Sequence, residues 1–116
     1  MNTVYAREDY LGADEYIDVV RKSGLERPID DRGRVERMLA HANLILTARQ
    51  DGRLVGFARS LTDFCFCCYL SDLAVDKACQ GQGIGKRLIE ETRIQAGGPL
   101  TTTLLLSAPT AKSFYQ

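Results

Sequence analysis

The sequence has no surplus of either charge and no long apolar run. Fifteen Lys and Arg residues balance fifteen Asp and Glu residues, whereas a dedicated nucleic-acid-binding protein usually carries a basic excess. No apolar stretch approaches the ~20 residues that a membrane-spanning helix needs. The first nine residues lack the basic start and the apolar stretch of a signal peptide. We therefore expect a cytoplasmic protein with neither nucleic-acid nor membrane partners.

Residues that could hold a metal ion are also scarce. His41 is the only histidine, and Cys65, Cys67 and Cys68 lie too close together for the paired spacing of a zinc site. No metal site is expected, and His41 is interpreted as structural. In a strand, Cys65 and Cys67 would share one face and Cys68 would take the other. We expect these three cysteines and Cys79 to be buried, reduced side chains.

The composition is that of one globular domain. A chain of 116 residues, 45% hydrophobic and 26% charged, can bury a core without a disulfide or a metal. No internal repeat, low-complexity segment or linker divides it. Residues 1–116 are therefore expected to form a single domain.

Apolar spacing and turn residues predict the order of the secondary structure. Strands are expected at residues 3–6, 44–49, 54–61, 64–75 and 101–107, and helices at 13–23, 35–42, 85–96 and 111–116. The order β-α-α-β-β-β-α-β-α describes an α/β fold with a mixed sheet. Its middle strands should form antiparallel hairpins, one of them closed by Asp51-Gly52. The 85–96 helix should make the strands before and after it parallel neighbours.

Three glycines alternate at Gly81, Gly83 and Gly85, where a strand is expected to pass into a helix. Each costs roughly 0.8–1 kcal/mol relative to Ala within a helix, so a sequence that needed only a helix would avoid them. Glycine permits a positive φ and the close approach of another group to the main chain. Convergent amides before a helix N-terminus favour an anion, above all a phosphate. The spacing fits neither a P-loop nor a dinucleotide-binding fingerprint.

The same segment resembles a known family. The motif Q/R-x-x-G-x-G/A of the GNAT superfamily of acyl-CoA-dependent N-acyltransferases is similar to Gln80-Gly81-Gln82-Gly83-Ile84-Gly85. Further similarities are the strand end Leu73-Ala74-Val75, Gly56 in the preceding strand, and Phe114-Tyr115 after the next strand. The resemblance covers essentially the whole chain and agrees with the element order above.

The resemblance implies a site for acetyl-CoA as co-substrate. The loop amides would hold the pyrophosphate, and the strand end would offer backbone groups to the pantetheine arm. The cofactor-binding residues that it implies are Leu73, Ala74, Val75, Gln80, Gly81, Gln82, Gly83, Ile84, Gly85 and Lys86.

Two catalytic candidates follow from the resemblance. Tyr115 occupies the place of a tyrosine that protonates the departing thiolate in many family members, although packing of a terminal helix would also explain it. Asp72 lies where the family often places an acid, and it is either the general base or a structural carboxylate. If Leu70 and Ala74 flank it on one strand face, burial should raise its pKa. Substrate choice should involve the 25–31 loop, its two flanking helices and the 62–69 hairpin region. In the loop, three acidic residues either attract a cationic amine or are simply solvated: Glu26, Asp30 and Asp31.

The implied activity is direct transfer of an acetyl group from acetyl-CoA to a primary amine of a small molecule or peptide. The alternatives are a non-catalytic acyl-CoA-binding or interaction module and a plain partner-binding α/β domain. Family members usually continue with two more strands, so the resemblance also implies a domain that is truncated at its C-terminus. The 101–107 strand would then expose an apolar edge, which a homodimer could cover.

Overall fold

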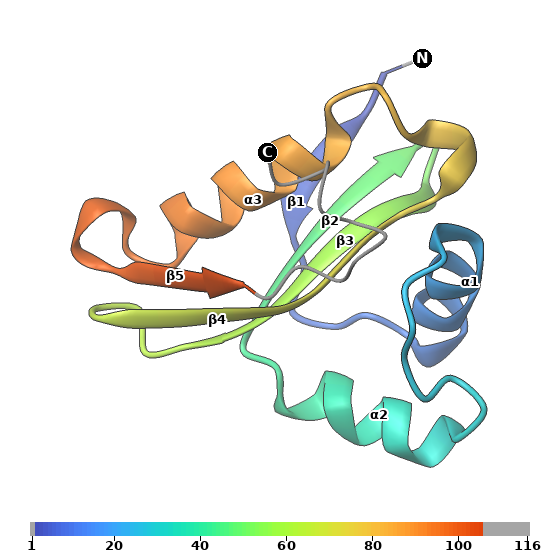
Figure 1. Ribbon diagram of the computed structural model, residues 1–116, viewed down its shortest axis with the longest axis horizontal. Coiled ribbons are helices and arrows are strands. Elements are labelled where there is room, and N and C mark those ends of the chain that lie inside the picture. Colours follow the sequence, from blue (N-terminus) through green and yellow to red (C-terminus); the bar gives the residue numbers. More distant parts are fainter. Residues whose placement is uncertain (1, 106–116) are drawn as a thin grey trace.

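The computed structural model describes residues 2–105, which form one mixed sheet with helices on both faces (Figure 1). The elements, in chain order, are β1 (Val4–Arg7), α1 (Ala13–Ser23), α2 (Arg32–His41), β2 (Leu44–Gln50), β3 (Arg53–Thr62), β4 (Cys67–Val75), the 3₁₀ turn η1 (Lys77–Cys79), α3 (Ile84–Gln95), the 3₁₀ turn η2 (Gly98–Leu100) and β5 (Thr102–Leu105). The predicted α/β class and the predicted order up to the fifth strand are confirmed. The predicted helix at 111–116 lies outside the described residues.

The strands follow one another across the sheet in the order β1-β2-β3-β4-β5. The first four are antiparallel, and β5 pairs with β4 in parallel after the α3 crossover. The turn between β2 and β3 contains Asp51 and Gly52, both with positive φ, as the Asp-Gly signal predicts. The parallel pairing of β4 with β5 confirms the prediction for the strands before and after α3.

The two faces of the sheet carry separate apolar cores. Helices α1 and α2 cover one face, where Tyr16, Val20 and Val35 meet Phe57. Helix α3 covers the other face, and its inward side chains, among them Leu88, join buried residues of β2, β3 and β4. Burial of each such Leu, Val or Phe contributes about 1.5–3 kcal/mol, so packing on both faces stabilises the sheet.

A bulge in β4 determines which side chains reach which face. Arg59 of β3 is opposite Asp72, whereas the next residue, Ser60, is opposite Leu70, so Ser71 is the extra residue. As a result, Leu70 belongs to the α3 core, while Asp72 contacts Tyr16 of α1 on the opposite face. The expectation that Leu70 and Asp72 share one strand face is wrong, because the inserted residue reverses the alternation.

The connection between β3 and β4 is a turn rather than the beginning of a strand, so the predicted strand start at residue 64 is wrong. The Asp63 carboxylate accepts the amides of Cys65, Phe66 and Cys67 at 2.8–3.0 Å, which closes the turn. These bonds hold the pKa of Asp63 well below its usual range. Cys65 and Cys67 are exposed here, which corrects the expectation of buried cysteines, whereas the remaining two are buried: Cys68 and Cys79.

Strand β5 is one of the two edge strands of the described sheet, and β1 is the other. Leu104 is 57% exposed, because only one side of β5 faces α3. Within residues 2–105, no helix is long and apolar enough to cross a membrane. The same residues contain no group of three or more His, Cys, Asp or Glu side chains placed to hold a metal ion.

Candidate functional site

The glycine-rich loop has the backbone conformation that its sequence predicts. Strand β4 ends at Val75, and Asp76 then caps the η1 turn by accepting the Ala78 amide at 2.9 Å. Gly81 and Gly83 adopt φ values of +85° and +79°, which a side chain would strain. Gly83 is the N-cap of α3, so the loop passes directly into the helix.

The amides at the start of α3 are available to a ligand. The first hydrogen bond of the helix runs from the Arg87 amide to the Gly83 carbonyl at 3.0 Å, so the amides of residues 84–86 precede the helical pattern. Within residues 2–105, the amides of residues 81–86 donate to no protein carbonyl. A twelve-residue helix places partial positive charge at this end, and the exposed side chain of Lys86 adds a full one. This arrangement favours an anion.

Gln80, by contrast, is engaged within the protein. Its amide donates to the Lys77 carbonyl at 3.4 Å, and its side-chain Nε2 donates to the Val75 carbonyl at 3.1 Å. The sequence predicts Gln80 as a pyrophosphate-binding residue. In the structure, its amide and its side chain form hydrogen bonds that connect the loop to the end of β4.

A second glutamine, Gln50, contacts the glycine-rich loop from the end of β2. Gln50, the buried last residue of β2, donates from Nε2 to the Gln82 side-chain oxygen at 3.3 Å and to Thr3 Oγ1 at 3.0 Å. Its Oε1 accepts the Cys79 thiol at 3.8 Å. Sequence reasoning missed Gln50, because nothing in a strand-ending glutamine indicates a contact 32 positions further along the chain.

The last five residues of β4 extend past the described part of β5. The β4–β5 register ends at the pair Leu70–Leu105, and beyond it 71–75 continue toward the glycine-rich loop. Leu73, Ala74 and Val75 pair with β3 on one edge and have buried side chains. On the other edge, no described residue of β5 pairs with them. Their main-chain groups are thus what this segment can offer to a ligand.

Gly56 allows the helix and this strand to approach closely. A Cβ atom on Gly56 would lie 3.1 Å from the Ala74 carbonyl oxygen and 3.3 Å from side-chain carbons of Ile84 and Leu88. Because Gly56 has no side chain, the first turn of α3 can pack directly against the end of β4.

Asp72 is the centre of a buried ionic network. Its Oδ1 accepts Arg27 Nε at 2.6 Å, and its Oδ2 accepts Arg59 Nε at 2.5 Å and the Tyr16 hydroxyl at 2.8 Å. Burial acts to raise the pKa of Asp72, but hydrogen bonds from Arg59 and Arg27 and their charges outweigh burial and lower it below its ordinary value. The expected raised pKa is wrong, since the bulge turns Asp72 toward arginines rather than toward Leu70.

The partners of Asp72 were not among the candidates from the sequence. An acid in a strand of buried residues does signal the need for a cation, and Arg59 could have been found from the hairpin register. Arg27 could not, because it comes from the loop between α1 and α2, 45 positions earlier.

Two other candidates, Asp31 and His41, form local contacts at the ends of α2. Asp31 caps α2 by accepting the Arg34 amide at 3.0 Å, and His41 contacts the Arg37 carbonyl of its own helix at 2.9 Å. Tyr115 lies outside the described residues.

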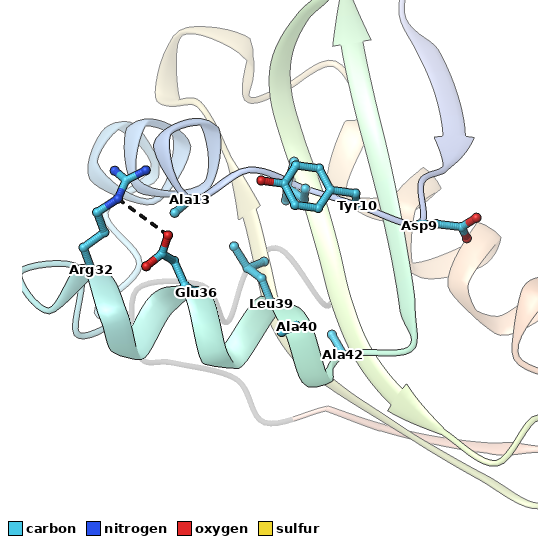
Figure 2. Close-up of a pocket in the computed structure, with 9 residues that line it drawn as sticks. Asp9, Tyr10, Ala13, Arg32, Glu36, Leu39, Ala40 and Ala42 are labelled. Atoms are coloured by element: carbon cyan, nitrogen blue, oxygen red, sulfur yellow. Dashed lines mark ion pairs between the residues drawn. The ribbon is translucent and has the colours of Figure 1, made fainter.

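A pocket of 350 Å³ lies between α2 and the connection from β1 to α1 (Figure 2). Its lining includes Tyr10, Leu39 and the Arg32–Glu36 ion pair. Among residues 2–105, none of the site residues predicted from the sequence lines it, so the glycine-rich loop and the end of β4 remain the candidate site.

Comparison with known proteins identifies the family. Residues 18–116 match the acetyltransferase (GNAT) domain, and the chain belongs to this family. The predicted resemblance is confirmed. Among curated proteins, no sequence matches the chain significantly.

Solved structures share the fold. A protein from meticillin-resistant Staphylococcus aureus, described as a probable acetyltransferase, superimposes with a TM-score of 0.81 at 20% identity, over 98% of this chain and 86% of that one. A GNAT-family acetyltransferase from Streptococcus pneumoniae has a TM-score of 0.75 at 19% identity, over 98% and 83%. Diaminobutyrate acetyltransferase from Paenibacillus lautus, solved with L-2,4-diaminobutyric acid and coenzyme A, has a TM-score of 0.71 at 17% identity, over 98% and 70%.

Proposed function

We propose that this GNAT domain transfers an acetyl group from acetyl-CoA to a primary amine. The observation that carries the proposal is the set of amides at residues 81–86, which precede the hydrogen bonding of α3 and lie beside the end of β4. Membership in the family and neighbours named as acetyltransferases, one of them solved with a diamine and coenzyme A, support it.

Two segments of the chain would bind different parts of coenzyme A. The amides of residues 81–86, with Lys86, would bind the pyrophosphate of coenzyme A. Gly81 and Gly83 permit the left-handed turns that aim these amides, while Gln80 and Gln50 brace the loop. The main chain of Leu73, Ala74 and Val75 would orient the pantetheine arm and the thioester.

Acetyl-CoA supplies a thioester: the amine nitrogen forms a bond to the acetyl carbon, the carbon–sulfur bond breaks, and the sulfur leaves as a thiol. The proposed donor to this sulfur is Tyr115. A phenol with a pKa near ~10 is a weaker acid than a thiol near ~8.5, so Tyr115 would act mainly as a hydrogen-bond donor to the developing charge.

The amine must also lose a proton, and Asp72 is poorly suited to take it. Four donors already occupy its oxygens, and two guanidinium groups stabilise its charged form. We therefore assign Asp72 to positioning the α1–α2 loop against β4, with the proton leaving through water.

The site is tested by binding of coenzyme A, followed by thermal unfolding. A ligand at 100 times its Kd stabilises a protein by about 2.7 kcal/mol. Gly83→Ala should abolish the shift, because a side chain is strained at its positive φ. The matched control is Gly52→Ala, whose φ of +80° is the same and whose Cβ also meets no atom within 4 Å, but which lies in the β2–β3 turn.

The control should lose comparable stability and keep the shift. A shift unchanged in Gly83→Ala would contradict the proposed loop site. Catalysis is tested by thiol release from acetyl-CoA with a panel of polyamines, amino sugars, amino acids and peptides. Saturable binding of coenzyme A without thiol release from any of them would instead assign a non-catalytic acyl-CoA-binding module.

A further inference from the structure

The network around Asp72 carries more positive than negative charge. Two guanidinium groups, Arg27 and Arg59, share one carboxylate, and within residues 2–105 neither forms an ion pair with any other acid. The Asp72 side chain is completely buried, that of Arg59 is 8% exposed and that of Arg27 is 28% exposed. A net charge of this kind, partly removed from water, favours a second anion.

Arg27 is the part of this network that a ligand can reach. It lies on the loop between α1 and α2, and its Nη2 donates to the Ser71 carbonyl at 2.7 Å, at the bulge of β4. Its remaining contacts are Nε to Asp72 and Nη1 to the Glu26 carbonyl, at 2.6 Å each. A guanidinium has five N–H groups, so these three bonds leave one N–H on each terminal nitrogen.

Arg59 supplies charge from the buried side of the same bulge. Its Nη2 donates to Ser71 Oγ at 3.0 Å and its Nη1 donates to the Met38 carbonyl at 3.3 Å, which hold it beneath β4. The exposed edge of Arg27 lies next to Ser71 and Asp72, at the start of the segment 71–75 that extends past the described β5.

We propose that the amine acceptor carries a carboxylate, and that Arg27 binds it while Arg59 reinforces the positive potential. This inference rests on the proposed function, because it places the acceptor beside the thioester segment of β4. A planar guanidinium binds a carboxylate through parallel hydrogen bonds, and an amine a few bonds from that carboxylate would then reach the acetyl carbon. The substrate class is that of amino acids and acidic peptides rather than polyamines or amino sugars.

Pairs of amines that differ only by a carboxylate test the proposal. In thiol-release assays, 2,4-diaminobutyrate is compared with 1,3-diaminopropane, and lysine with cadaverine. We expect kcat/KM to be at least tenfold higher for the carboxylate-bearing member of at least one pair. Arg27→Gln should remove that preference mainly by raising KM, and Arg27→Lys should restore part of it. Arg21→Gln, an exposed arginine near the end of α1, is the matched control and should change nothing.

A binding measurement separates this inference from the proposed function. Calorimetry on the protein saturated with coenzyme A compares N-acetylated products with and without the carboxylate. Binding that requires the carboxylate and weakens at least tenfold in Arg27→Gln supports the inference, even if no amine is turned over. Equal turnover of both members of every pair, or equal binding of both products, overturns it and leaves acetyl transfer intact. If Arg27→Gln does not fold, Arg27→Lys and the wild-type comparison decide.

Discussion

The hydroxyl of Tyr16 on α1 donates a 2.8 Å hydrogen bond to Asp72 on β4, 56 positions away in the chain. Both side chains are completely buried, and the Tyr16 ring packs 4.9 Å from that of Phe57. Burial, and then the charge of Asp72, raise the pKa of Tyr16, so its hydroxyl remains a neutral donor. This bond joins the helix to the strand that borders the candidate site.

Removal of the Tyr16 hydroxyl should therefore destabilise the domain. Tyr16→Phe keeps the ring packing and removes one donor to a buried carboxylate, which should lower the free energy of unfolding by about 1.5–3 kcal/mol. Urea unfolding measures the change. Tyr10→Phe is the control, because Tyr10 is 80% exposed and should change stability by less than about 0.5 kcal/mol. Equal effects of the two substitutions would contradict the role of the bond.

Asp72 should make stability depend on pH in the acidic range. Its pKa is lowered in the folded protein, so its contribution is complete above the unfolded pKa of about 3.9 and is lost as the pH falls through the folded value. Asp72→Asn should cost about 3–5 kcal/mol at pH 6, because it leaves two arginines without their acid. That difference from wild type should shrink below about pH 4.

Asp18→Asn provides the comparison for Asp72→Asn. Asp18 pairs with Lys22 on the exposed side of α1, so its loss should cost less than about 1 kcal/mol at every pH. An Asp72→Asn difference that stays constant between pH 6 and pH 3 would show that the charge of Asp72 is not what stabilises the fold.

The close contact at Gly56 predicts opposite results for the same substitution at two glycines. Gly56→Ala forces a methyl group against the Ala74 carbonyl and two α3 side chains, which should cost about 1–3 kcal/mol and weaken binding of coenzyme A. Gly33→Ala, in exposed α2, meets no atom closer than 3.6 Å and should stabilise by up to about 1 kcal/mol. Thermal unfolding with and without coenzyme A checks both, and stabilisation by Gly56→Ala would refute the close packing.

Gln50 should affect binding of coenzyme A without touching it. Gln50→Leu removes the donor to Gln82 and to Thr3 while keeping a side chain of similar size in the buried position. We expect the affinity for coenzyme A to fall several-fold, since the loop loses its support from β2. Titration of coenzyme A measures this, and the control is Gln95→Leu at the exposed end of α3. Unchanged affinity in Gln50→Leu would remove it from the site.

Much of the fold could be predicted because its signals are local. The spacing of Tyr16 and Val20 marks one face of a helix, Asp51-Gly52 marks a hairpin, and the alternation of Gly81, Gly83 and Gly85 marks a special turn before a helix. Each depends on residues within one or two turns of each other. The family resemblance depends on the same short segment, and the match to the GNAT domain confirmed it.

The errors arose where one residue changed a pattern. Phe64 and Phe66 have strand propensity, but the Asp63 side chain captures the next amides and makes a turn. Ser71 adds a residue to β4, and strand alternation is a simple count that a single insertion reverses. Neither exception can be read from hydrophobic pattern alone.

The sequence by itself determined the order of the elements up to β5 and the position of the glycine-rich loop, because these depend on neighbouring residues. Only the tertiary structure decided that Asp72 faces Arg27, Arg59 and Tyr16, and that Gln50 supports Gln82. Such contacts join distant parts of the chain, and their geometry follows from strand register and helix packing.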